Sequence, residues 1–414
     1  MSRIKSFVYV FIICGMFGAS SAYATGGDVV VSLRINEPYM QVNGINAEID
    51  QGRGTSPVIV NGRTLVPIRA IIEAYGGKVD WDAATSTVSL SVDDDIIKLI
   101  INSNTAYLNG TAYTLDVSPA IINERTMLPI RFVAEGFNFG VAWNSKTQTV
   151  SVIKNTLDSE EYEFIINNLP EYSGHAYTTF NNNTPMFKDY EIIEGSFEYY
   201  SELDDLGRCS VCISSVCDET MPTEDRESIS SVLPTGWKNA SYDIVDGGYV
   251  YNRCHLIGFQ LTGENANNRN LITGTRYMNV EGMLAFENMV DDYIELSGNH
   301  VMYRATPVFV DNNLVAHGVL LEAYSVEDAG MGLSFCVYCY NVQPGISIDY
   351  STGNNYIDGY IFEDNDIVST NKVYRTPTGK RYHFDARCGG KNSFETTLDE
   401  AKNEGLTPCK KCAS

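Results

Sequence analysis

One histidine and one asparagine could together support hydrolytic chemistry. His255 is one of only five histidines in the 414 residues, and it follows a strand-like run at residues 248–251. Asn279 lies early in a long helical pattern. An imidazole can take a proton from water, and an amide oxygen can hold a metal ion that neutralises phosphate. Together they are the minimum that a one-metal phosphodiesterase needs.

The helical pattern runs from residue 275 to about residue 297. Its apolar positions are spaced three or four residues apart, at Met283, Phe286, Val290 and Ile294. Asn279 falls on the same stripe, and a polar amide on a buried face is costly unless it is satisfied. Two interpretations are open: a core Asn that is hydrogen-bonded to backbone, or an Asn whose oxygen holds a metal ion.

Further motifs occur in one order between about residues 157 and 344. They are Pro-Thr-Gly-Trp at 234–237, Asn-Arg-Cys-His-Leu at 252–256, Gln-Leu-Thr-Gly-Glu-Asn-Ala-Asn at 260–267, Asn-Leu-Ile-Thr-Gly-Thr-Arg at 270–276 and Thr-Pro-Val-Phe at 306–309. With Asn279, they resemble the DNA/RNA non-specific endonuclease family, in its DNA-entry-nuclease branch, which has the ββα-metal fold. The family signature is Asp-Arg-Gly-His, and here Asn252 and Cys254 replace its Asp and Gly.

The resemblance implies a role for each matching residue. His255 would be the general base, and Asn279 would be the one direct protein ligand of Mg²⁺ or Mn²⁺. Glu287 would order the waters of the metal, although a solvated helix Glu is the alternative. Bracing of the site is implied for Asn270. Phosphate contact is implied for the arginines of the matching segments: Arg253, Arg276, Arg208 and Arg226.

The implied reaction is hydrolysis of DNA, with RNA as a second candidate substrate, and without sequence specificity because contacts go to the backbone. Net charge is −23, and residues 157–370 hold 34 acidic and 8 basic side chains. This balance excludes binding by broad phosphate neutralisation, so we expect a small positive cleft helped by the metal. Two alternatives stay open: an envelope-attached nucleic-acid capture or adhesion protein with an inactive nuclease fold, and a nuclease toxin.

An internal repeat precedes this region. Residues 57–69 align without gaps with residues 119–131, at an offset of 62, and the match continues through Trp81 and Trp143. Each unit predicts a strand and turn, a helix after the Pro and a hairpin around the Trp. Residues 30–155 resemble the copper amine oxidase N-terminal-like stalk domain. The absence of His and Cys argues against a copper site, and we expect a rigid spacer or a cell-envelope contact.

The end of the chain carries a metal-ligand pattern. Residues 348–371 are rich in Asn and Asp and predict a linker, and residues 372–414 look like a small Ada-type metal-binding module. Forty-odd residues bury little core, so Zn²⁺ or a disulfide, Cys409–Cys412 or Cys388–Cys409, is expected as a staple. Nine basic and five acidic residues make the module locally positive, so it could help to hold nucleic acid. The candidate zinc ligands combine His-x₄-Cys with Cys-x₂-Cys spacing: His383, Cys388, Cys409 and Cys412.

The first 24 residues predict a secretory signal. Arg3 and Lys5 are followed by an apolar run at residues 7–17 and by a small-residue cleavage site that ends at Ala24. That run is too short to span a membrane, and no later run of about 20 apolar residues occurs. We therefore expect a secreted or cell-surface protein without a transmembrane segment in the mature chain. Nine cysteines remain, an odd number whose pairing the sequence does not give.

These patterns predict a multidomain α+β chain. Its expected parts are a signal peptide (1–24), an α/β repeat stalk domain (30–155), a ββα-metal nuclease core (157–347), a linker (348–371) and a small zinc-type module (372–414).

Overall fold

The computed structural model describes residues 28–154, residues 159–358 and most of residues 372–410 (372–377, 379–383, 387, 388, 390 and 392–410). The chain divides into two compact units, Met1–Asn355 and Tyr356–Ser414. The predicted signal peptide, residues 359–371 of the predicted linker and Cys412 lie outside the described residues. In the described part, every helix is too short or too polar to cross a membrane.

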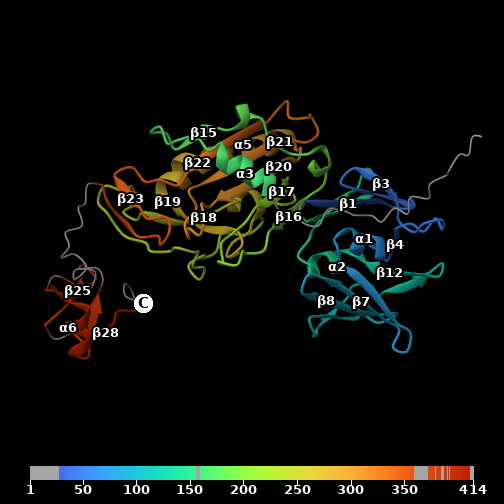
Figure 1. Cartoon of the computed structure of the whole chain (residues 1–414), viewed down its shortest axis with the longest axis horizontal. Coiled ribbons are helices and arrows are strands. Elements are labelled where there is room, and N and C mark those ends of the chain that lie inside the picture. The colour runs from blue at the N-terminus through green and yellow to red at the C-terminus, as the bar shows by residue number, and fades with distance from the viewer. Residues whose placement is uncertain are drawn as a thin grey trace, which may run out of the picture. The chain divides into compact units, whose positions relative to one another are not determined.

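The first part of the larger unit contains three small antiparallel sheets and two short helices (Figure 1). Its elements are β1 (Val29–Arg34), β2 (Tyr39–Val42), β3 (Ile45–Glu48), β4 (Val58–Val60), β5 (Arg63–Pro67), α1 (Arg69–Ala74), β6 (Lys78–Asp82), β7 (Thr87–Val92), β8 (Asp95–Ile100), β9 (Thr105–Leu108), β10 (Thr111–Thr114), β11 (Ala120–Ile122), β12 (Arg125–Pro129), α2 (Ile130–Gly136), β13 (Gly140–Asn144) and β14 (Thr149–Lys154). The sheet orders are β13-β14-β1-β2-β3, β10-β9-β8-β7-β6 and β11-β12-β5-β4.

The two sequence repeats form matching elements. In each repeat a hairpin leads to a short helix after a proline and then to a hairpin that carries the tryptophan, as predicted. Alternate residues of β7 are buried, as expected for a strand with one face on a core. The repeats differ at the tryptophans, because Trp143 packs against the shared core whereas Trp81 is 45% exposed.

The second part of the larger unit is built on a six-stranded antiparallel sheet of order β15-β22-β21-β20-β17-β16 (Figure 1). Its elements are α3 (Ser159–Asn167), β15 (Tyr177–Thr179), η1 (Asn181–Asn183), η2 (Asp189–Glu191), β16 (Phe197–Tyr200), β17 (Cys212–Val216), β18 (Tyr251–His255), α4 (Phe259–Thr262), β19 (Leu271–Thr275), η3 (Met278–Met283), α5 (Leu284–Ser297), β20 (Val301–Val308), β21 (Gly318–Ser325), β22 (Ser334–Tyr340), β23 (Ile346–Ile348) and β24 (Asn355–Ile357).

A two-stranded hairpin and a helix lie against this sheet. β18 pairs with β19, which leads directly into η3 and α5. Val290 and Ile294 of α5 are fully buried in the same core cluster as Leu321 of β21 and Val337 of β22. Apolar burial of this kind supplies most of the free energy that fixes a helix on a sheet. The hairpin and the helix therefore form one stable frame for the residues between them.

The predicted helix from residue 275 to residue 297 differs at its start. Thr275 ends β19, η3 is a π-helical turn, and α5 begins only at Leu284. Asn279 is therefore half-buried rather than part of the buried stripe. A π-helical turn shifts the phase of side chains, which a uniform 3.6-residue spacing cannot reveal. The apolar residues of the stripe are buried as predicted: Met283, Phe286, Val290 and Ile294.

The predicted linker begins too early at residue 348. β24 pairs with β23, and the amide of the buried Asn355 donates to the backbone oxygen of Lys238 over 2.9 Å. The larger compact unit accordingly extends to Asn355. The polar composition of this segment predicts a linker, but hydrogen bonds of its side chains hold it on the larger unit. A second such bond runs from Tyr350 Oη to the backbone oxygen of Asn341.

The smaller unit is a four-stranded sheet with one helix. Its elements are β25 (Lys372–Arg375), β26 (Arg381–His383), β27 (Phe394–Thr397), α6 (Leu398–Asn403) and β28 (Thr407–Pro408), in the sheet order β27-β25-β26-β28. Its described hydrophobic core consists of Val373, Tyr382, Ala401 and Leu406. So small a core supplies little stability by itself.

Candidate active site

His255 is the last residue of β18 and pairs with Leu271, the first residue of β19. The next two residues, Leu256 and Ile257, are fully buried, so the strand end is anchored in the core. His255 itself is only 5% exposed. The hairpin thus holds the imidazole at a fixed place beside the loop that leads to α4.

The hydrogen bonds of the His255 ring define its tautomer. Nε2 lies 2.9 Å from the backbone oxygen of Asn265, and a carbonyl oxygen can only accept, so Nε2 carries the proton. Nδ1 then keeps its lone pair and lies 3.4 Å from Nη2 of Arg226. A neutral ring with a fixed N–H and an unprotonated Nδ1, which here accepts a long hydrogen bond from Arg226, is the state that a general base requires.

The surroundings of His255 favour this neutral state. Burial, together with the positive charge of Arg226, lowers the pKa of His255 to about 4, although hydrogen bonds to the backbone at Asn265 and Glu264 act in the opposite direction. The ring is therefore uncharged at neutral pH. Arg226, which also lies over the ring of Phe259, is placed beside the nitrogen that would receive a proton.

Asn270 braces the chain just after His255. Its Oδ1 accepts from the backbone N–H of Ile257 over 2.9 Å, and its Nδ2 donates to the backbone oxygen of the same residue over 3.0 Å. The side chain is fully buried. Because both groups of one amide are used on one residue, Asn270 fixes the backbone two residues from His255.

Asn279 lies beside the thiol of Cys254. The thiol donates to Asn279 Oδ1 over 2.9 Å, and burial raises the pKa of Cys254, which keeps the thiol protonated. The side chain of Cys254 has room because residue 274 is glycine: a Cβ at that position would lie 2.5 Å from Cys254 Cβ. An amide oxygen has two lone pairs, so one remains for a cation.

Glu287 is buried in α5 and not solvated, so the alternative of an ordinary surface glutamate is wrong. It is 9% exposed, and burial raises its pKa to about 7 while Arg226 acts in the opposite direction. Its carboxylate lies over Gly258, where a Cβ would be 2.7 Å from Oε2. The absence of a side chain at Gly258 thus allows α5 to bring a carboxylate to the loop after β18.

Three other predicted residues are engaged elsewhere in the described structure. Arg253 donates to the backbone oxygens of Val232 and Ser230 and stacks on Trp237. Arg208 pairs with Asp204 and donates to the oxygens of Asp311 and Asn313, and Arg276 pairs with Asp246. The phosphate roles of these three arginines stay predictions, because each guanidinium contacts groups of the protein itself.

Sequence reasoning identified the side chains of the site but missed three of their partners. The backbone oxygen of Asn265, the thiol of Cys254 and the bare Gly258 each position a predicted residue. A backbone acceptor leaves no sequence signal. A signal did exist for the other two, because a cysteine beside the histidine and a glycine three residues after it are chemically conspicuous.

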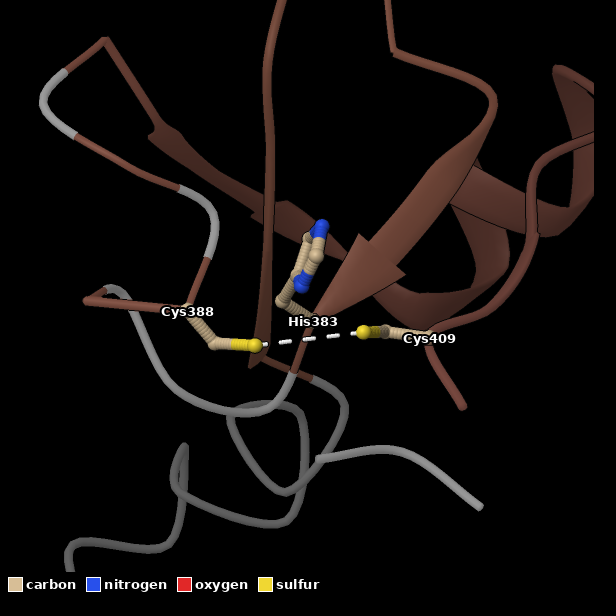
Figure 2. Close-up of side chains that lie close together, drawn as sticks. All are labelled: His383, Cys388 and Cys409. Carbon is tan, nitrogen blue, oxygen red and sulfur yellow. Dashed lines mark hydrogen bonds between the residues drawn. The ribbon is translucent and has the colours of Figure 1, made fainter. Parts of the chain in front are cut away.

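The smaller unit brings three of the four predicted zinc ligands together, and Figure 2 shows His383 of β26 beside the two thiols. The ligand atoms of His383, Cys388 and Cys409 all lie within 4.8 Å of one another. The sulfurs of Cys388 and Cys409 are 3.8 Å apart. Two thiolates on one tetrahedral zinc, each about 2.3 Å from it, would stand at about that separation, whereas a disulfide requires about 2.05 Å.

Two sequence families match the chain. Residues 51–152 match the copper amine oxidase N-terminal domain, and residues 188–327 match the DNA/RNA non-specific endonuclease family. No curated protein matches it.

Solved structures also align with the chain. NucA from Streptococcus agalactiae with magnesium bound is 24% identical, with a TM-score of 0.41, over 48% of this chain and 97% of that one. Sda1 nuclease with bound zinc is 25% identical, with a TM-score of 0.38, over 44% and 96%. A protein described as an extracellular endonuclease is 21% identical, with a TM-score of 0.32, over 45% and 100%.

Proposed function

Since the chain contains a copper amine oxidase N-terminal domain followed by a DNA/RNA non-specific endonuclease domain, we propose that it is a secreted, metal-dependent endonuclease that hydrolyses phosphodiester bonds of DNA and also of RNA. The observation that carries the proposal is the ring of His255, neutral and fixed by Asn265 with its Nδ1 lone pair beside a guanidinium.

His255 and the side chains around it would have different roles in the reaction. Nδ1 takes the proton of the attacking water, while the bond from Nε2–H to the carbonyl of Asn265 keeps the ring from turning. Arg226 attracts the negatively charged phosphate to the same nitrogen. Asn270 holds the backbone of Ile257, so the distance between base and substrate is set by packed structure.

The donors near Cys254 fit a hard cation such as Mg²⁺ or Mn²⁺. Asn279 Oδ1 keeps a lone pair after it accepts from the thiol, and the buried carboxylate of Glu287 supplies negative charge nearby. Oxygen donors of this kind suit both ions. When bound, the ion would neutralise phosphate charge and stabilise the departing oxygen. We assign Asn279 as its protein ligand and Glu287 as the residue that orders water beside it.

The proposal also covers the rest of the chain. We assign the phosphate contacts to Arg253, Arg208 and Arg276 as well as Arg226, the cell-envelope contact to residues 30–155, and a structural Zn²⁺ to the smaller unit. The charge of the body supports a metal-assisted mode of binding, because 34 acidic and 8 basic side chains between residues 157 and 370 repel nucleic acid as a whole.

Cleavage of plasmid DNA by the secreted form, residues 25–414, tests the function directly. We expect cleavage with Mg²⁺, none with EDTA, and a loss of about 10³-fold or more in His255→Ala, since general-base catalysis and the nucleophile it activates are both lost. Circular dichroism would show that the variant is folded. Intact plasmid in every lane, but retarded by bound protein, would replace the enzyme with the nucleic-acid capture protein.

A further inference from the structure

A second cluster with the elements of a reactive site lies away from His255, at the far ends of β17 and β20. The register of these strands pairs Val216 with Val301, so the next residues outward, Cys217 and His300, face each other across the sheet. The thiol of Cys217 is the side-chain neighbour that raises the pKa of His300 most. Cross-strand geometry therefore places a nucleophilic sulfur directly against an imidazole.

A carboxylate orients the imidazole from its other side. His300 Nδ1 lies 2.6 Å from Glu327 Oε1, and the backbone N–H of His300 donates to Glu327 Oε2 over 2.8 Å. Because a carboxylate accepts, Nδ1 carries a proton and Nε2 is the nitrogen left for the thiol. Sulfur, imidazole ring and carboxylate thus stand in a row, with the ring held between the thiol and its orienting carboxylate.

The electrostatics of His300 support this arrangement. The bond to Cys217 and the interactions with Glu327 raise the pKa of His300 to about 9, against the opposing effect of burial. The ring is consequently an imidazolium at neutral pH, which places a positive charge beside the sulfur of Cys217. The backbone of Cys217 is held as well, because its N–H donates to Thr220 Oγ1 and its oxygen accepts from Thr220 N.

The other cysteines of the larger unit have different surroundings. Burial raises the pKa of each of the following thiols: Cys209, Cys212, Cys254, Cys336 and Cys339. Four of them have no exposed surface, and Cys209 is 7% exposed. Cys217 is 5% exposed at the end of its strand, next to the exposed Asp218 and Glu219, and differs from Cys209 in having the imidazole of His300 as its neighbour. Selective reaction at one thiol is the expected consequence.

We propose that Cys217, His300 and Glu327 form a nucleophilic thiol site that exchanges with low-molecular-weight disulfides. The sulfur of Cys217 forms a bond to one sulfur of the disulfide, the original S–S bond breaks, and the second sulfur leaves with the bonding pair as a thiolate. The imidazolium of His300 gives a proton to that leaving thiolate, and the ring takes up the proton of the Cys217 thiol in its place. The small disulfide is the only oxidant, and the product is a mixed disulfide at Cys217.

A coloured aromatic disulfide, dithiobis-nitrobenzoate, tests this site in the full secreted chain with zinc bound. We expect one rapid release of coloured thiolate per chain, with mass spectrometry placing the label on Cys217. The other five thiols of the larger unit should react at least about tenfold more slowly. His300→Gln should slow labelling of Cys217 about tenfold. His317→Gln is the matched control, because His317 is also half-buried but stacks on Tyr350, and its labelling should equal that of wild type.

Two results would overturn the assignment. One is labelling of Cys217 that is no faster than that of Cys254 and appears only as the protein unfolds. The other is an unchanged rate in a His300→Gln variant whose melting temperature matches wild type. If that variant does not fold, the wild-type label map still decides, because it compares six thiols in one native protein. Plasmid cleavage is not the readout, so either outcome leaves the nuclease proposal to its own test.

Discussion

His255 has a hydrogen-bonded environment that makes a definite pH prediction. Its pKa lies near 4, below the ordinary value of 6.5, mainly because burial disfavours the imidazolium. The base is therefore active above this value and is lost as pH falls through it. At saturating Mg²⁺, which favours the ionised form of Glu287, kcat/KM should hold from neutral pH to about pH 5 and then fall towards tenfold per pH unit below about 4.

The variant Arg226→Gln tests whether the guanidinium helps to lower the pKa of His255. Removing the guanidinium removes one of the two causes that lower the pKa of His255, while burial remains. The acid limb should move to higher pH but stay below 6.5, alongside a lower overall rate from the lost phosphate contact. Initial rates between pH 4 and pH 8, with folding followed by circular dichroism, decide the matter. An acid limb that Arg226→Gln leaves unmoved would show that another group controls the titration.

The sequence named the candidate residues of the site but not the contacts that position them. His255 and Asn279 could be predicted because their types and order match a family pattern, and Asn270 because it falls in the same pattern. The tautomer of His255 depends on the carbonyl of Asn265, which every residue type would offer equally. The burial of Glu287 could not be predicted either, since a charged helix residue is usually solvated.

At the scale of elements, the hairpin and helix could be predicted but the turn between them could not. β18, β19 and α5 follow strand-like and helical patterns. η3 does not, because a π-helical turn leaves no regular repeat in the sequence. Asn279 lies in this turn and is half-buried, with its oxygen accepting from the buried thiol of Cys254.

Gly258→Ala tests how α5 meets the loop after β18. Gly258 has φ −58°, which alanine adopts without strain, but its Cβ would lie 2.7 Å from Oε2 and 2.8 Å from Cδ of Glu287. We expect the carboxylate to be displaced, with cleavage reduced tenfold or more and stability reduced by about 1–3 kcal/mol, as in other overpacked sites. Plasmid cleavage and thermal unfolding measure the two effects.

A double-mutant cycle separates this contact from a general defect. If Gly258→Ala acts by displacing the carboxylate of Glu287, adding it to Glu287→Gln should cost little further activity, because the carboxylate is already absent. Additive losses in the double variant would mean that Gly258 acts through the backbone of α4 and not through the carboxylate.

At the scale of the whole molecule, charge is distributed unevenly along the chain. Residues 157–370 are strongly acidic, whereas residues 372–414 hold nine basic and five acidic side chains. Several exposed basic residues adjoin the candidate zinc ligands in sequence: Arg381 precedes His383 by two, Arg387 precedes Cys388, and Lys410 follows Cys409. A metal bound by these ligands would bring the neighbouring basic side chains close to one another. The smaller unit would then present positive charge to a polyanion such as nucleic acid.

Removal of zinc should therefore affect the smaller unit selectively. Its described core has four residues, so a bound metal would carry much of its stability, as in other small metal-held folds. We expect about one Zn²⁺ per chain by elemental analysis. After chelation and return of Mg²⁺, residues 356–414 should become sensitive to protease, whereas residues 28–355 should stay resistant. Plasmid cleavage should persist. Cys388→Ser should lose the zinc, whereas Cys336→Ser, at a buried position in the nuclease sheet, should retain it. Equal zinc content in both variants would place the metal elsewhere and leave the 3.8 Å approach of Cys388 and Cys409 as a thiol contact alone.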